Sequence, residues 1–85
     1  MEIRQLQYFL AVAEQLSFSK AAAILYVTQP LLSQQIADLE RQLGTDLFVR
    51  NRRSVSLTPA GSALYREASA IFRQMNQAVS NVRNA

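Results

Sequence analysis

The 85-residue sequence contains no cysteine and no histidine. Without cysteine the chain can form no disulfide and no reactive thiolate, and without either residue it lacks the usual protein ligands of zinc and iron. No apolar run approaches the roughly 20 residues that a membrane-spanning helix needs, and the N-terminus does not have the pattern of a signal peptide. These absences are compatible with the cytoplasm, and they exclude disulfide scaffolds, zinc folds and thiol enzymes.

The sequence also offers little from which an enzyme active site could be built. It has only two glycines, with no glycine-rich phosphate loop and no Gly-x-Ser-x-Gly nucleophile motif. Its six carboxylates show no clustering that suggests a paired acid and base or a metal site. We therefore predict that the protein is not an enzyme and that this chain holds no cofactor.

The chain does have enough apolar material for one small core, together with a modest positive charge. Hydrophobic residues make up 49% of it, and its length is close to the size at which a partner surface helps stability. Nine lysines and arginines against six acids give a net charge of +3, and eight of the nine are arginine, whose forked donors suit phosphate. This excess alone does not identify a nucleic-acid-binding protein.

The most informative stretch is a helix predicted over residues 28–43. Thr28 can cap its N-terminus, and Pro30 falls in the first turn, where a missing N–H costs little. Apolar residues recur at steps of four, three and four and so form one stripe that is expected to be buried. They are Leu32, Ile36, Leu39 and Leu43. Gly44 is well placed to end the helix in a left-handed conformation.

The opposite side of this helix carries mainly small and amide side chains. They are Gln29, Pro30, Ser33, Gln34 and Ala37, followed by Arg41. Amides can pair with base edges, hydroxyls can bind phosphates, and the positive end of the helix dipole favours an anion, so this face suits close approach to DNA. Taken alone, the same pattern also fits an ordinary amphipathic helix with a solvated polar face.

The preceding residues favour the DNA interpretation, because they predict a second, short helix. Ser19 can cap it, and Phe18 is placed to pack on Ala23. The alanines at 21–23 leave a thin surface that another helix can cross closely, as in a helix-turn-helix. The turn that follows lacks the glycine often found there, so Tyr26 or a neighbour is expected to adopt an uncommon backbone conformation.

An amphipathic helix from Ile3 to about residues 14–16 is predicted to come first in the chain. Its apolar face would support the two helices of the helix-turn-helix. We interpret it as scaffold, with Arg4 and Gln5 as minor candidates for phosphate contact.

A small β-hairpin is predicted after the helix-turn-helix, from two runs of β-forming residues at 47–50 and 54–57. Its tip is cationic, with Arg50, Arg52 and Arg53 within four positions. Such a tip is usually solvated in a monomeric globule, but beside a helix-turn-helix it forms a wing that can lie along the DNA backbone or enter the minor groove.

The last predicted helix begins at Thr58 and Pro59, an N-cap followed by proline in the first turn. Apolar residues follow it in alternating steps of four and three, as in a coiled coil. With two neighbours they are Leu64, Ala68, Ile71, Phe72, Met75, Ala78, Val79 and Val82. This helix could pack back on its own domain, but its end lies roughly 30 Å or more from its start, beyond what so small a core covers. We predict that it forms a homodimer interface.

In these motifs the sequence resembles the N-terminal DNA-binding domain of LysR-type transcriptional regulators, from Met1 to about Val82. The first matches are Leu6-Gln7-Tyr8-Phe9, Ser17-Phe18-Ser19-Lys20-Ala21-Ala22 and Val27-Thr28-Gln29-Pro30-Leu31-Leu32-Ser33-Gln34-Gln35-Ile36. The pattern continues through Leu39-Glu40, Leu43-Gly44, Leu47-Phe48-Val49-Arg50, Arg53 and Leu57-Thr58-Pro59-Ala60-Gly61. Many separate matches in the same order make the resemblance specific.

The resemblance implies a mainly α-helical fold, with a winged helix-turn-helix over residues 1–58 and a linker or dimerisation helix over residues 59–85. It implies a bacterial regulator that binds double-stranded DNA at interrupted palindromes, in the cytoplasm on the nucleoid and not at a membrane. Relatives commonly carry a C-terminal domain that senses a small-molecule inducer, which these residues do not include, and they often assemble as tetramers. We therefore expect a fragment of a longer protein.

The resemblance also implies roles for individual residues. Gln29, Pro30, Ser33 and Gln34 would face bases in the major groove, while Thr28, Arg50, Arg52 and Arg53 would contact the backbone or the minor groove. Position 34 is often arginine in relatives, so a preference for guanine at the matching base is not expected, and adenine is the more natural partner of an amide.

A competing hypothesis assigns the same fold to a protein-interaction module that never touches DNA. An acidic or apolar exposed face on the helix at 28–43 would favour that module. The amides, hydroxyls and wing arginines of this sequence favour DNA.

Overall fold

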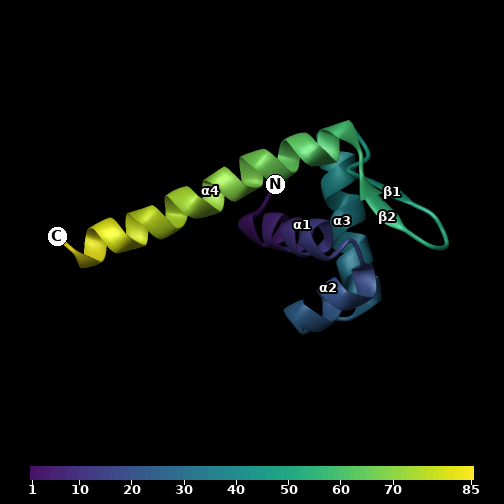
Figure 1. The fold of residues 1–85 in the computed structure, drawn as a ribbon, viewed down its shortest axis with the longest axis horizontal. Helices are drawn as coiled ribbons and strands as arrows, with labels where there is room; N and C mark the ends of the chain where they lie inside the picture. Colours follow the sequence, from purple (N-terminus) through teal and green to yellow (C-terminus); the bar gives the residue numbers. More distant parts are fainter.

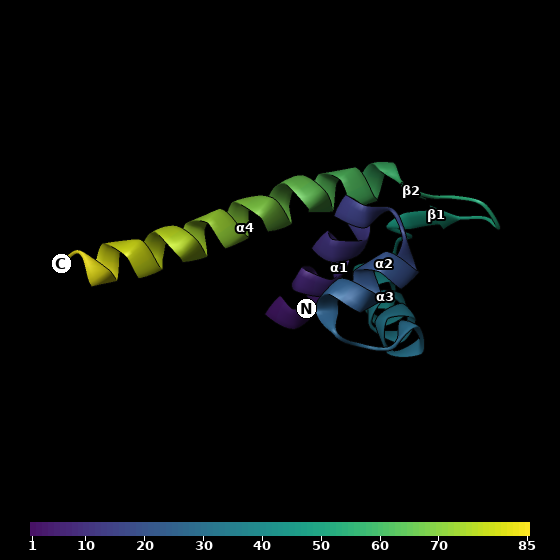
Figure 2. The same ribbon diagram turned by 60° about the horizontal axis from the view of Figure 1, so that its bottom comes forward.

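The computed structural model describes all of residues 1–85 and consists of four helices and one hairpin. The elements are α1 (Ile3–Gln15), α2 (Phe18–Leu25), α3 (Gln29–Leu43), β1 (Phe48–Arg50), β2 (Val55–Leu57) and α4 (Pro59–Arg83). Helices α1 to α3 pack together, while the hairpin and α4 leave this body in opposite directions (Figures 1 and 2). The predicted mainly α-helical winged helix-turn-helix is confirmed.

The core lies where α3 crosses α1 and α2. Leu32, Ile36 and Leu39 of α3 are completely buried against Phe9 and Val12 of α1. The alanines at 21 and 22 are also buried, which lets α2 approach closely as predicted. The stripe prediction is wrong at its end, because Leu43 is 41% exposed where the helix runs past the core.

Three of the predicted helix boundaries follow from local capping residues. Thr28 Oγ1 accepts the Leu31 N–H at 3.3 Å, and Thr58 Oγ1 accepts the Gly61 N–H at 3.0 Å. Gly44 ends α3 with a φ of 69°, in the left-handed region that glycine adopts without strain. These short-range signals confirm the predicted bounds of α3 and the start of α4.

The predicted cap of α2 is wrong by two residues. Ser17, not Ser19, precedes the helix, and its Oγ accepts the Lys20 N–H at 3.1 Å. Phe18 is therefore the first helical residue and forms no staple with Ala23, which is exposed. Its ring instead packs edge-on against Phe48, with ring centroids 5.8 Å apart.

Replacing Ser17 by alanine is expected to lower the free energy of unfolding by about 1 kcal/mol, because the Lys20 N–H loses its acceptor. Ser19→Ala is the matched control, since the Ser19 hydroxyl caps no backbone group. Urea denaturation followed by circular dichroism measures both. Equal losses for the two variants would contradict the assignment of Ser17 as the cap.

The turn between α2 and α3 has the uncommon conformation that the missing glycine predicted. Tyr26 has a φ of 58° and a side chain that is 95% exposed. Its N–H is directed at the carbonyl oxygens of Ala22 and Ala23, which closes the end of α2. Leu16, after α1, is also left-handed, with a φ of 48°. Both ends of α2 are therefore set by sharp turns.

The wing is a short antiparallel hairpin in which Phe48 pairs with Leu57 and Arg50 with Val55. Asn51 shapes its tip, because its Oδ1 accepts the N–H groups of Arg53 at 3.0 Å and Ser54 at 2.9 Å. All four residues of the tip, 51–54, are exposed, so its arginines are accessible to solvent.

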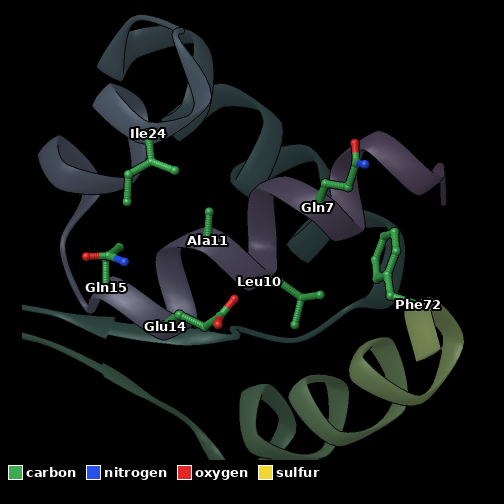
Figure 3. Close-up of a pocket in the computed structure, with 7 residues that line it drawn as sticks. All are labelled: Gln7, Leu10, Ala11, Glu14, Gln15, Ile24 and Phe72. Atoms are coloured by element: carbon green, nitrogen blue, oxygen red, sulfur yellow. The ribbon is translucent and has the colours of Figure 1, made fainter. Parts of the chain in front are cut away.

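Helix α4 is divided between its own domain and solvent. Ala68 is completely buried and Leu64 is half-buried against the core, so Ala68 offers no surface to a partner and its assignment to the dimer interface is wrong. Phe72 lies beside Leu10 at the edge of a hollow of about 400 Å³ between α1, α2 and α4 (Figure 3). Beyond it the helix is exposed on all sides.

None of the helices combines the length and the apolar character that crossing a membrane requires. Nowhere in the chain do three or more His, Cys, Asp or Glu side chains come together in a group that could hold a metal ion.

Candidate nucleic-acid interface

The start of α3, the start of α2 and the wing tip share one open hollow of about 270 Å³. Gln29, Arg52 and Arg53, which the sequence assigned to DNA contact, all line it. The fold thus brings together one predicted base-reading residue and two predicted backbone contacts from segments more than 20 positions apart.

Several polar residues of this hollow were not among the predicted site residues. They are Ser17, Ser19, Asn51 and Ser54. Ser17 and Ser19 lie at the N-terminus of α2, where unpaired N–H groups and the helix dipole favour an anion. The two serines around the start of an alanine-rich helix were a usable signal, but the sequence could not show that this helix start lies beside the wing.

The predicted recognition face of α3 is uncovered in its first half. Gln29, Pro30 and Gln34 are exposed, while Ser33 is half-buried. Thr28 is exposed and its Oγ1 is occupied only as an acceptor, so its hydroxyl hydrogen remains free to donate to a phosphate. No carboxylate lies in this half of the helix.

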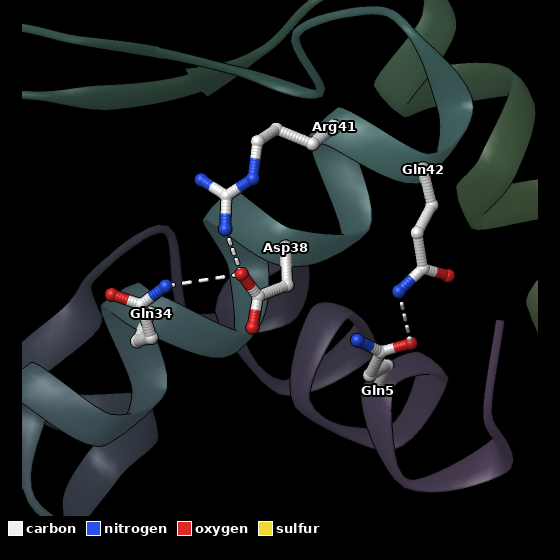
Figure 4. A network of polar contacts seen from close by, with 5 residues as sticks. All are labelled: Gln5, Gln34, Asp38, Arg41 and Gln42. Carbon is white, nitrogen blue, oxygen red and sulfur yellow. Dashed lines mark hydrogen bonds and ion pairs between the residues drawn. The ribbon is translucent and has the colours of Figure 1, made fainter.

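The side chain of Gln34 has a hydrogen-bond partner, Asp38, which lies one turn further along α3 (Figure 4). The Gln34 Nε2 donates to Asp38 Oδ1 at 3.0 Å, and Arg41 pairs with the same oxygen. The contact fixes which way the amide is turned, leaving its carbonyl oxygen and its second N–H hydrogen free. These are the acceptor and donor that the N6 and N7 edge of adenine requires.

Arg50 is placed differently from the two arginines of the tip. Its Cζ lies 4.1 Å from the centroid of the Phe18 ring, and its Nη2 lies 4.0 Å from Glu40 Oε1. Its side chain is 40% exposed. A contact between Arg50 and a phosphate would therefore compete with packing inside the protein, whereas Arg52 and Arg53 make no ion pair.

The interpretation of Gln5 as a minor candidate for phosphate contact is wrong. Gln5 is buried, its Oε1 accepts the Glu2 N–H at 3.1 Å, and it also accepts Gln42 Nε2 at 3.4 Å (Figure 4). Gln5 therefore ties α1 to the end of α3. Arg4 is exposed.

Comparison with protein families gives one match, to the bacterial regulatory helix-turn-helix proteins of the lysR family, over residues 3–62. Among curated relatives, the chain is 49% identical to the Hca operon transcriptional activator HcaR of Escherichia coli, over 92% of this chain and 26% of that protein. It is 47% identical to the HTH-type transcriptional regulator BudR of Klebsiella aerogenes, over 98% of this chain and 58% of that protein. These relatives are transcriptional regulators, not enzymes.

Several solved structures are similar to this chain over nearly its whole length. The complex of the BenM DBD with catB site 1 DNA is similar with a TM-score of 0.94 and 44% identity, over 99% of this chain and 93% of that chain. The complex of the CbnR DBD with DNA has a TM-score of 0.92 and 39% identity, over 99% and 97%. Full-length BenM has a TM-score of 0.90 and 44% identity, over 98% of this chain but 27% of that chain. The chain spans only about a quarter of most of the curated relatives it matches.

Proposed function

The chain belongs to the LysR family of bacterial regulatory helix-turn-helix proteins, and we propose that it binds double-stranded DNA sequence-specifically as the DNA-binding part of a transcriptional regulator. One observation carries the proposal: the uncovered, carboxylate-free first half of α3 shares a face with the exposed arginines of the wing. Polar donors without acids suit a groove lined by phosphates.

In this proposal α3 enters the major groove and the wing follows the adjacent backbone or minor groove. The base-reading residues are Gln29, Pro30, Ser33 and Gln34. Thr28, Arg52 and Arg53 contact phosphates, and Arg50 joins them only where it leaves Phe18. The hydrogen bond from Gln34 to Asp38 favours adenine opposite Gln34.

Residues 1–58 form the DNA-binding unit of the proposed regulator, and residues 59–85 form its linker and dimerisation helix. The apolar residues of α4 that its own domain leaves accessible supply the interface with a second copy. They are Ile71, Phe72, Met75, Ala78, Val79 and Val82, with the half-buried Leu64 at the margin. Two copies present two α3 helices to one interrupted palindrome.

The intact regulator acts on the nucleoid in the cytoplasm, and a small-molecule inducer binds a domain outside these residues. Full-length chains assemble as tetramers. The support for these three points is the family to which the chain belongs and the small share of its relatives that the chain spans.

A binding selection from random duplexes at two salt concentrations tests the proposal. We expect enrichment of a two-fold symmetric motif and a fall in affinity with salt, with a log–log slope of about 0.9 for each phosphate neutralised. A protein-interaction module would enrich no motif, and that outcome would overturn the proposal.

Individual variants separate base reading from phosphate binding. Gln34→Ala is expected to cost about 1 to 3 kcal/mol at one base pair of each half-site and to relax the preference there. Arg53→Ala is expected to weaken binding to all duplexes and to reduce the salt slope by about 1. Affinity for the selected duplex and its single-base variants at two salt concentrations measures both effects. Equal loss on selected and random duplexes for Gln34→Ala would contradict its place in the groove.

A further inference from the structure

The root of the wing consists of Leu47 and Phe48, where the chain enters β1. A single α3 side chain, that of Glu40, holds this root to the end of α3 by hydrogen bonds. Its Oε2 accepts the backbone N–H of Leu47 at 2.7 Å and that of Phe48 at 3.4 Å. The side chain is only 16% exposed, and hydrogen bonds to a partly shielded carboxylate are stronger than neutral ones. No other α3 side chain hydrogen-bonds to the hairpin or to its root.

The other carboxylate oxygen of Glu40 faces the far end of the same strand. Oε1 lies 4.0 Å from Arg50 Nη2, and the Arg50 guanidinium lies over the ring of Phe18. Phe18 packs in turn on Phe48, at the near end of β1. Both ends of β1 are thus fixed against the end of α3 and the start of α2, and Glu40 touches both.

The tip of the wing has no such anchors. The hydrogen bonds that Asn51 makes go to Arg53 and Ser54, within the tip itself. With strands of only three residues each, the direction of Arg52 and Arg53 is therefore determined at the root.

We propose that Glu40 is a positioning residue: it sets the direction of the wing relative to α3, so that the wing arginines meet the duplex while α3 lies in the groove. This inference rests on the proposed DNA binding. Glu40 itself lies away from the DNA and acts through the backbone of β1 and through Arg50.

A double-mutant cycle tests the role of Glu40. Glu40→Gln keeps the length of the side chain and one acceptor, but it removes the charge and places an amide NH2 group among donors. We expect it to weaken binding to the selected duplex about tenfold. In a background carrying Arg52→Ala and Arg53→Ala, the same replacement is expected to change affinity less than about twofold, because neither tip arginine remains to be misplaced.

Glu67→Gln on the exposed side of α4 is the matched control for charge, and it is expected to have the same small effect in both backgrounds. Equal losses from Glu40→Gln in the two backgrounds would overturn the inference, since a role in general folding makes the effects additive. If the unaltered chain binds no duplex, the proposed function fails instead, so the two failures are distinguishable.

The position of the wing can also be measured without DNA, because a chain that lacks cysteine can be spin-labelled at chosen sites. Labels at Gln34→Cys and Arg52→Cys report the distance between α3 and the wing tip. Glu40→Gln is expected to shift or broaden that distance, and Arg50→Gln, which leaves the hydrogen bonds of Glu40 in place, is expected to do so less. An unchanged distance in both variants would overturn the inference.

Discussion

Replacing Met75 by glutamate is expected to convert the proposed dimer into monomers and to weaken binding to a two-half-site duplex by about a hundredfold or more, because linked binding is lost. The accessible apolar residues of α4, from Ile71 to Val82, form the seam along which the two helices of the proposed dimer pair. Met75 lies in the middle of this seam and is 40% exposed in the single chain. Two carboxylates placed in the paired seam would lose their water without gaining a partner. Analytical ultracentrifugation and titration of the duplex measure the two effects.

The same replacement is expected to leave the fold of the single chain almost unchanged, within about 0.5 kcal/mol, because the side chain is exposed. Gln77→Glu is the matched control, since Gln77 lies two positions away and so on the opposite side of the helix. It adds the same charge outside the seam and should leave the dimer intact. A dimer that survives Met75→Glu would show that the chains pair through another surface.

Replacing Gly61 by alanine is expected to cost about 3 kcal/mol of unfolding free energy, through overpacking that the site cannot relieve. Gly61 is buried in the first turn of α4, and a Cβ there would overlap the carbonyl oxygen of Leu47 and lie 3.0 Å from Leu57 Cδ2. That carbonyl accepts the Thr58 N–H at 3.0 Å, so the backbone cannot move away without losing a hydrogen bond. Thermal and urea unfolding measure the loss.

Gly44→Ala provides the comparison, because it is the only other glycine in the chain. A Cβ at Gly44 meets nothing within 4 Å, but the φ of 69° is unfavourable for alanine, so we expect a cost of about 1 kcal/mol. Similar costs at the two glycines would contradict the steric account of Gly61.

The sequence predicted most of the fold, because its signals are local. Thr28, Gly44 and Thr58 act through hydrogen bonds or φ values within three residues, and pattern alone locates them. The cap of α2 was misplaced because Ser17 and Ser19 are equally good caps. The choice between them depends on Phe18 packing against Phe48, thirty positions away.

The candidate site was predicted residue by residue, but not as an arrangement. The tip arginines and Gln29 were chosen from the sequence, and the structure places them beside each other. Three features depend on contacts between distant segments and had no sequence signal: the burial of Ala68 by its own domain, the engagement of Arg50 with Phe18, and the contact of Glu40 with the wing root.

Helix α4 spans 25 residues, and it contains no glycine or proline after Gly61. It is therefore a stiff lever, about 37 Å long at 1.5 Å per residue. In the proposed pair the helices cross near Met75, about 24 Å from Pro59 at 1.5 Å per residue. A change of about 8° in the crossing angle then moves the Pro59 end of one helix by about 3 Å relative to the other helix, comparable to the rise between successive base pairs. A small change in the crossing angle is thus enough to align both DNA-binding units with their half-sites, or to misalign them.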